Sequence, residues 1–337
     1  MREFIHHSNT SKLIINIITI LLLIVSIGLS VSYGSTNIAL ETVWQAVFHF
    51  NPEITTHQVI QELRLPRAFS AALVGAFLAV SGAIMQGMTR NPLASPSIMG
   101  VTDGAAFALV LMLAFFPTIS TMGLISSSFI GAGLAVGLVF MVGSFSPSGL
   151  TPVKLALAGV AIGTMLRSIS SILSLHFNLE KQMGFWLAGG LDGTSWTTVT
   201  ILLISGAIGL FIAISISKSI TVLSLGEDMA TGLGQNNLMI KLFGILSILI
   251  LTGAAVSVAG AVGFVGLIVP HITRFIIGTD YRWIIPSSIL FGALLLVLAD
   301  VVSRLVNAPF ETPVGAITSL IGVPFFLYLA RGSGGGK

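Results

Sequence analysis

The residues best suited to chemistry form a short polar segment in an otherwise apolar chain. This segment, LGEDMATGLG (Leu225–Gly234), carries two neighbouring carboxylates, Glu227 and Asp228, among glycines and small residues. It is compatible with a helix of one or two turns, bracketed by Gly226 and Gly234. Such a helix can lie in a groove of another protein, and the alternative is a solvated loop. We predict that it binds a soluble partner.

A pair of arginines in RLPR (Arg64–Arg67) stands at the start of a predicted membrane span. Guanidinium groups hold carboxylates through two parallel hydrogen bonds, so the pair could be a socket for acidic groups of a partner. The alternative is that both side chains reach out of the membrane at a helix end that Pro66 stiffens. The residues alone leave both interpretations open.

Charged residues inside membrane spans are costly, so each is a candidate functional residue. Asp300 can pair with Arg304 four residues later on the same helix. Arg167 lies inside a predicted span, and we expect it to face a water-filled path. We expect no acidic residue at mid-membrane of the kind that proton-coupled carriers often require.

Composition sets the class of protein. Of 337 residues, 54% are hydrophobic and 8% are charged, and the mean hydropathy is +1.01. An ordinary soluble domain carries about 25% charged residues, so lipid must be the solvent here. We therefore predict an all-α polytopic membrane protein with a single transmembrane domain over residues 1–337.

Several kinds of site are excluded or disfavoured by residue content. Cysteine is absent, which rules out disulfides and thiolate metal sites, and the six histidines form no ligand set, so no metal site is predicted. The net charge of +3 comes from scattered basic residues, which argues against nucleic-acid binding. A phosphate-binding loop of the form G-x-x-x-x-G-K-[ST] is missing, so we expect neither a nucleotide cofactor nor catalysis in this chain.

Apolar runs predict about ten transmembrane helices. The first, residues 13–33, resembles a signal peptide but is long enough to span, and we predict that it is retained. The expected spans are 13–33, 65–88, 93–115, 122–143, 152–174, 197–217, 239–260, 263–277, 283–303 and 313–330.

The eighth span is too short to cross comfortably and contains Gly263, Gly266 and Pro270, so we expect a tilted or broken helix buried in protein. On the fifth span, Gly159 and Gly163 form a small-xxx-small pair that permits close helix contact.

The segments outside the spans set the orientation. Basic residues favour the cytoplasmic side, which places both termini and the segment Leu225–Gly234 inside the cell. Short helices are expected around Leu40–Phe50, within a long loop Gly34–Glu62, and within His176–Thr194. Residues 332–337 are predicted to be a flexible tail. Basic residues on the inner side are Arg2, Lys12, Arg90, Lys154, Lys218, Lys241, Arg274, Arg282, Arg331 and Lys337, and those on the outer side are Arg64, Arg67, Lys181 and Arg304.

Several long motifs in the correct order resemble the iron-siderophore and cobalamin permeases (FecCD/BtuC-like), the membrane subunits of type II ABC importers. The similarity runs from about Leu63 to Leu329. It is carried by the segments Arg64–Val101, LGEDMATGLG, Ala259–Arg282 and Ala299–Leu329.

This resemblance implies a type II ABC importer permease architecture in a cell (inner) membrane. It also implies a second permease subunit, as a homo- or heterodimer, two ATPase subunits that bind ATP and Mg²⁺, and an extracellular substrate-binding protein. By position in the family motifs, Arg64, Arg67 and Arg304 are expected to dock the binding protein. The family's ATPase-coupling helix matches Leu225, Gly226, Glu227, Asp228, Met229, Ala230, Thr231, Leu233 and Gly234.

The resemblance implies import of a ferric siderophore, and cobalamin or haem remains an alternative within the family. The translocation path is expected to include the fifth and eighth spans, with Gly159, Gly163, Arg167, Gly263, Gly266 and Pro270 as candidates. An alternative from another class is a secondary transporter driven by an ion gradient.

Overall fold

A computed structural model of the chain describes residues 8–34, 37–144 and 152–333. Every regular element in these ranges is helical, which confirms the all-α prediction. The elements are α1 (Asn9–Ser32), α2 (Leu40–Phe48), α3 (Thr55–Val59), the π-helical turn η1 (Ile60–Arg64), α4 (Leu65–Thr89), the 3₁₀ turn η2 (Pro96–Met99), α5 (Val101–Phe115), α6 (Thr121–Ser144), α7 (Pro152–His176), α8 (Glu180–Ala188), α9 (Trp196–Ser215), α10 (Ser217–Leu225), α11 (Glu227–Gly232), α12 (Asn237–Ala259), α13 (Val265–Ile277), α14 (Tyr281–Leu305) and α15 (Val314–Ser333).

Membrane spans match the sequence prediction in number and order. Among the described residues, 7 helical stretches are long and apolar enough to cross a membrane, judged by length and composition. Three shorter apolar helices, Val101–Phe115, Val265–Ile277 and Val314–Tyr328, correspond to the third, eighth and tenth predicted spans. The prediction of a polytopic membrane protein with about ten membrane helices is confirmed.

The loop predicted over Gly34–Glu62 is wrong in its second half. α3, η1 and α4 form one helical stretch, Thr55–Thr89, of 35 residues. Pro66 lacks a backbone N–H, and the π-helical turn just before it lets the helix continue past this missing donor. The RLPR segment therefore lies inside a long helix rather than at a helix start.

The third span begins later than predicted. Its expected start at residue 93 is replaced by η2, and α5 begins only at Val101. Pro96 favours a tight turn, and Gly100 has φ +75°, which most other residues avoid. The break places Asp103 in the first turn of α5, where its side chain is 14% exposed.

The short helices predicted outside the spans are confirmed as α2 and α8. The tail predicted over 332–337 is tested only at its start, where Gly332 and Ser333 continue α15, and residues 334–337 lie outside the described ranges.

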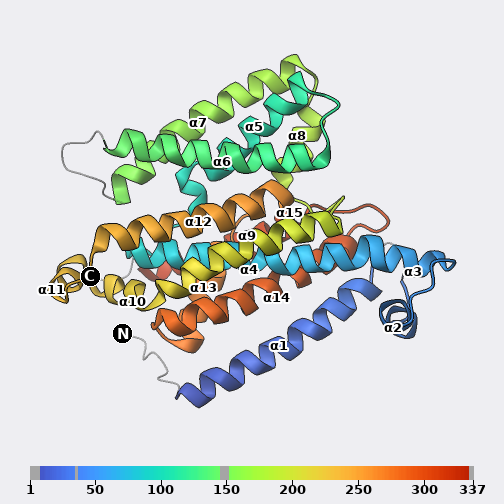
Figure 1. The fold of residues 1–337 in the computed structure, drawn as a ribbon, viewed down its shortest axis with the longest axis horizontal. Coiled ribbons are helices and arrows are strands. Elements are labelled where there is room, and N and C mark those ends of the chain that lie inside the picture. The colour runs from blue at the N-terminus through green and yellow to red at the C-terminus, as the bar shows by residue number, and fades with distance from the viewer. Residues whose placement is uncertain (1–7, 35–36, 145–151, 334–337) are drawn as a thin grey trace.

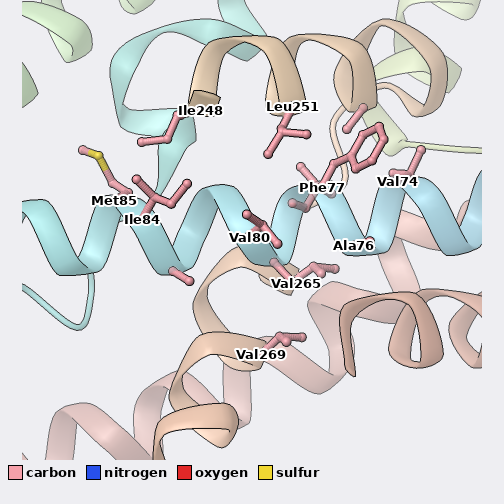
Figure 2. Close-up of a cluster of buried hydrophobic side chains, with 14 of the residues drawn as sticks. Val74, Ala76, Phe77, Val80, Ile84, Met85, Ile248, Leu251, Val265 and Val269 are labelled. Atoms are coloured by element: carbon pink, nitrogen blue, oxygen red, sulfur yellow. The ribbon is translucent and has the colours of Figure 1, made fainter. Parts of the chain in front are cut away.

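α4 is the centre of the helix packing. Of its most apolar window, 83% is buried, compared with 28% for α1. Figure 2 shows Phe77 and Ile84 of α4 facing Ile248 and Leu251 of α12, with Val265 of α13 on another side of α4.

Two glycine contacts let α4 approach its neighbours closely. Gly75 lies against the backbone of Gly292 in α14, and Gly82 lies against the backbone of Gly266 in α13. A Cβ at Gly75 or Gly82 would collide with backbone atoms of the facing helix, so small residues permit these crossings.

The molecule has two distinct ends (Figure 1). The beginning of α1 and the short helix α11 lie at one end, and α2, α3 and α8 lie at the other. We call these the α11 end and the arginine end, because Arg64, Arg67 and Arg304 lie near the latter. α5, α6 and α7 form a group of helices beside the block built around α4.

Candidate functional site

At the arginine end, two of the three predicted docking arginines cap the last turn of α1. Arg64 donates to the carbonyls of Val31 and Ser32 at 2.7 and 2.9 Å. Arg304 donates to the carbonyls of Ser30 and Tyr33 at 3.0 and 2.8 Å. The last carbonyls of a helix have no partner within the helix and carry a partial negative charge, so two guanidinium groups stabilise this end strongly.

Arg67 has a different environment, made of carboxylates. It pairs with Asp300 at 2.9 Å, with Glu311 at 2.8 Å and with Asp192 at 3.2 Å. Asp300 is fully buried and also pairs with Arg304 at 3.0 Å, so the ion pair predicted at this spacing is confirmed. The other two carboxylates come from the α8–α9 and α14–α15 loops, and Arg67 thus ties two loops to the body of the protein.

The three arginines line one cleft of about 750 Å³. Arg64 and Arg304 are 8% and 5% exposed, so the protein itself covers nearly all of both side chains. The side chain of Arg67 is 15% exposed, whereas those of Asp192 and Glu311 are 67% and 37% exposed. An incoming group would therefore meet Arg67 and its loop carboxylates before the other two arginines.

Asp192 and Glu311 lie close together where the two loops meet, and their pKa values shift in opposite directions. The hydrogen bond with Glu311, together with burial, raises the pKa of Asp192 to about 6, although Arg67 acts in the opposite direction. The same hydrogen bond and Arg67 keep the pKa of Glu311 below its ordinary value. As the pH falls through about 6, Asp192 therefore gains a proton and holds Arg67 less strongly. Sequence reasoning missed both carboxylates as partners of Arg67, because nothing in their spacing shows that two loops meet there.

At the opposite end, the predicted coupling segment folds as the short helix that its residues suggested. α11 runs from Glu227 to Gly232, and Gly226 and Gly234 flank it with φ values of +143° and +78°. Such left-handed conformations favour glycine. Glu227 pairs with Lys241 of α12 at 2.8 Å, and its side chain is 40% exposed.

Three large apolar side chains of this segment are exposed, and we call them the apolar ridge. They are Leu225, Met229 and Leu233, which are 67%, 61% and 72% exposed and lie at the end of α10, within α11 and directly after α11. Ala230 is fully buried, and Asn237 donates to the carbonyl of Glu227 at 3.0 Å, so the helix is held firmly against its own chain. Sequence reasoning stressed the acids of this segment and overlooked the spacing of its apolar residues.

The predicted path residues fall into two groups. On α7, Gly159 packs against the backbone of Ile98, and Gly163 lies against the carboxylate of Asp103. Asp103 also pairs with Arg167 at 2.8 Å. Asp103 lies in the first turn of α5, and sequence reasoning did not single it out although it stands within the predicted span 93–115. The expectation of no acidic residue at mid-membrane stays a prediction.

The second group lies on and before α13. Gly266 contacts α4 closely, and Pro270 is a buried residue inside the helix. Gly263 precedes the helix and has open space beside it apart from Ser319. We expected a tilted or broken helix buried in protein. No break is seen, because α13 is one helix from Val265 to Ile277 with Pro270 inside it, while its buried residues agree with packing in protein. The lining of a path stays a prediction for both groups.

Within the described ranges, no group of three or more histidine or acidic side chains is placed to hold a metal ion.

Comparison with known proteins agrees with this geometry. The model of the FecCD transport family matches residues 22–332. The chain is 61% identical over 303 residues to the iron(3+)-hydroxamate import system permease protein FhuB of Bacillus subtilis, which covers 90% of this chain and 79% of that protein. It is 46% identical over 310 residues to the iron-uptake system permease protein FeuB of the same organism, covering 92% and 93% of the two chains.

A solved structure of a metal-chelate type ABC transporter in an inward-facing conformation superposes with a TM-score of 0.83. Sequence identity is 31%, and the match covers 94% of this chain and 98% of that one. Fold and likeness together define a multi-pass membrane permease of the ABC transporter class. The chain belongs to the FecCD transport family.

The arginine cluster predicts a stability effect that an exposed ion pair does not share. Changing Arg304 to Ala leaves the buried Asp300 with one partner fewer and uncaps α1, so we expect a loss of about 3–5 kcal/mol. The matched change, Arg282→Ala, removes an exposed pair with Asp280 and should leave the unfolding midpoint unchanged. Thermal unfolding in detergent compares the two, and equal midpoints would contradict the capping role.

Proposed function

We propose that this chain is the membrane permease subunit of an ATP-driven importer that carries a ferric siderophore of the hydroxamate type into the cytoplasm. The observation that supports this choice of cargo is the 61% identity to an iron(3+)-hydroxamate permease over 90% of the chain. Two permease subunits would form the path, two ATPase subunits would bind ATP and Mg²⁺ at the α11 end, and an extracellular binding protein would deliver the cargo at the arginine end. Both termini would lie in the cytoplasm.

The cargo is tested by transport in proteoliposomes that contain the permease, its ATPase and its binding protein. We expect ATP-dependent uptake of a radiolabelled ferric hydroxamate, with at least tenfold lower uptake of cobalamin and haem. Uptake of cobalamin or haem alone would select the alternative cargo. Uptake that survives without ATP but stops with a protonophore would identify an ion-coupled carrier instead.

Docking, in this proposal, is an exchange of carboxylates at Arg67. Arg64 and Arg304 are committed to the end of α1, whereas Asp192 and Glu311 lie on loops and are exposed. An acidic side chain of the binding protein would enter the cleft and replace these loop carboxylates on Arg67. The loops would then be released from the body of the protein, which links docking to opening at this end.

Exchange makes docking depend on pH through Asp192. The pKa of about 6 means that Asp192 loses its charge as the pH falls from 7.5 to 5.5, and its competition for Arg67 falls with it. We expect binding-protein affinity to rise about fivefold over this range, an effect of about 1 kcal/mol from one nearby charge.

The variant Asp192→Asn should bind tightly at both pH values, and Glu53→Gln, which removes an exposed acid from the α2–α3 loop, should behave as the wild type. Affinity can be measured with the permease in nanodiscs, and an Asp192→Asn protein that keeps the full pH dependence would refute the exchange.

Coupling to the ATPase is proposed to use the apolar ridge of Leu225, Met229 and Leu233. Three exposed apolar side chains gain most when a partner removes them from water. Met229→Arg should therefore lower transport and cargo-stimulated ATP hydrolysis at least tenfold.

Two variants complete this test. Met239→Arg changes an exposed methionine near the start of α12 and should have little effect. Asp228→Arg tests whether coupling uses the apolar ridge or the carboxylates. If this variant inhibits strongly while Met229→Arg has a mild effect, coupling depends on the carboxylates.

A further inference from the structure

The short helix α2 at the arginine end carries large apolar side chains on its outer surface. Leu40, Trp44 and Phe48 are 59%, 63% and 60% exposed. They recur every four residues, so they share one face of the helix, which we call the α2 face. The rings of Trp44 and Phe48 lie with their centroids 4.3 Å apart, which makes this face a continuous apolar surface. Such a surface marks a contact with an apolar environment.

The rest of α2 divides into two further sectors. Val43 and Ala46 are buried against the chain, whereas Glu41, Gln45 and His49 are polar and exposed. Since successive residues are about 100° apart around a helix, the buried sector, the α2 face and the polar sector follow one another around α2. A helix with one packed side, one apolar side and one polar side suits a boundary between hydrocarbon and water.

The buried sector fixes the direction of the α2 face. It belongs to a cluster that joins the end of α1, the turn η1 and the start of α4, and whose buried members are Val31, Val43, Ala46, Ile60 and Ala68. The side-chain amide of Gln61 in η1 also donates to the carbonyl of Ala46 at 2.8 Å. α2 cannot turn its exposed apolar residues inward without losing these contacts, so the fold itself holds the α2 face outward.

α2 lies where a membrane span ends. The span α1 ends at Ser32, and only 28% of its most apolar window is buried, so most of α1 faces lipid. Ile24 and Val25, near its end, are 60% and 59% exposed. Figure 1 shows α2 nearly end-on just beyond the end of α1, whose axis runs across the picture, so α2 lies crosswise to the span. A lipid-facing span thus leads directly to a helix in the plane of the membrane.

A second tryptophan marks the same depth from another helix. Trp196 is the first residue of the span α9, is 44% exposed, and its indole N–H donates to the carbonyl of Gln61 at 2.8 Å. Tryptophan is enriched at the membrane–water boundary, because its ring is apolar and its N–H is polar. Gln61 therefore contacts the tryptophan at the start of α9 and, through Ala46, the helix α2. Both elements place the boundary at η1.

We propose that α2 is an interfacial anchor, whose face of Leu40, Trp44 and Phe48 inserts into the membrane leaflet at the arginine end. Glu41 and Gln45 stay in water. α2 contains no lysine or arginine, so the contact is with the acyl-chain region of the lipid and needs no anionic headgroup. Because α2 is joined to η1, the anchor fixes the depth of the start of α4 in the membrane. This inference does not depend on the cargo or on the proposed importer function.

Lipid fits the α2 face better than a soluble partner does. Lipid covers the face at all times, whereas a partner that binds and leaves would expose three large apolar side chains to water in every cycle. The face also contains no charged side chain, so it offers nothing for the electrostatic steering that speeds transient docking.

Spin labelling in nanodiscs of phosphatidylcholine, without binding protein, tests the anchor. The chain has no cysteine, so each single replacement reports on one position. Labels at Leu40→Cys and Phe48→Cys should be at least fivefold less accessible to a water-soluble nickel chelate than labels at Glu41→Cys and Gln45→Cys. Their depth should be about 5–10 Å below the headgroup surface. Equal nickel accessibility of the two sectors would overturn the proposal. Protection that appears only after binding protein is added would also overturn it and would assign the face to that partner.

Two charge variants test whether lipid contact stabilises α2. Phe48→Asp places a charge on the α2 face, and Gln45→Asp places the same charge on the polar sector. We expect backbone amides of Leu40–Phe48 to exchange hydrogen at least tenfold faster in Phe48→Asp and within twofold of the wild type in Gln45→Asp. Both positions are exposed, so the thermal unfolding midpoint of the whole protein should stay the same in both variants. Equal exchange in the two variants would contradict insertion, and so would an α2 that is protected only when phosphatidylglycerol is added to the nanodiscs.

Discussion

The structure depends on one constraint, which is that every charge at membrane depth needs a partner. Only 8% of the residues are charged, and the buried ones are grouped rather than scattered. Asp300, fully buried, holds Arg67 and Arg304, and Arg304 in turn caps α1. Asp103, which is 14% exposed, pairs with the largely exposed Arg167 and joins α5 to α7. The Asp300 cluster holds α1, α4 and α14 together at the arginine end, because an unpaired buried charge would cost several kcal/mol.

Packing between these charged groups relies on small residues. α4 crosses α14 at Gly75 and Gly292, and it crosses α13 at Gly82 and Gly266. Lipid tails are as apolar as leucine, so close backbone contact supplies the attraction that water would supply in a soluble protein. The result is a rigid central helix with charged or polar contacts near both of its ends.

The sequence was sufficient to predict the helical class, the number of spans and the position of α11, because each depends on local composition. Apolar runs of about 20 residues need no tertiary information. The Asp300–Arg304 pair was predictable for the same reason, since both residues lie on one helix. The predicted start of the third span was wrong, because Pro96 and Gly100 break the helix inside an apolar run. The helical stretch before Arg64 was missed, because a π-helical turn lets the helix continue through Pro66.

The candidate site was harder to predict, because its main contacts join residues far apart in the chain. Arg67 pairs with carboxylates that are more than a hundred residues away in the chain, and Arg167 on α7 pairs with Asp103 on α5. No spacing rule links such residues. The arginines were singled out by residue type, but their partners, which decide what each arginine can do, are a property of the fold alone.

Transport requires that a change at one end of a permease alters the other end, and α4 connects the two ends. Near the arginine end it carries Arg67, tied to two loops. Near the other end Gln86 donates to the carbonyl of Gly266 at 3.2 Å and accepts from Arg274, so α13 is tied to the same helix. Between these points α4 is the most buried span and has little room to bend. If docking moves the loops on Arg67 as proposed, a stiff α4 would pass this shift to α13 as movement of whole helices, which favours rigid-body rocking over local rearrangement as the proposed transport motion.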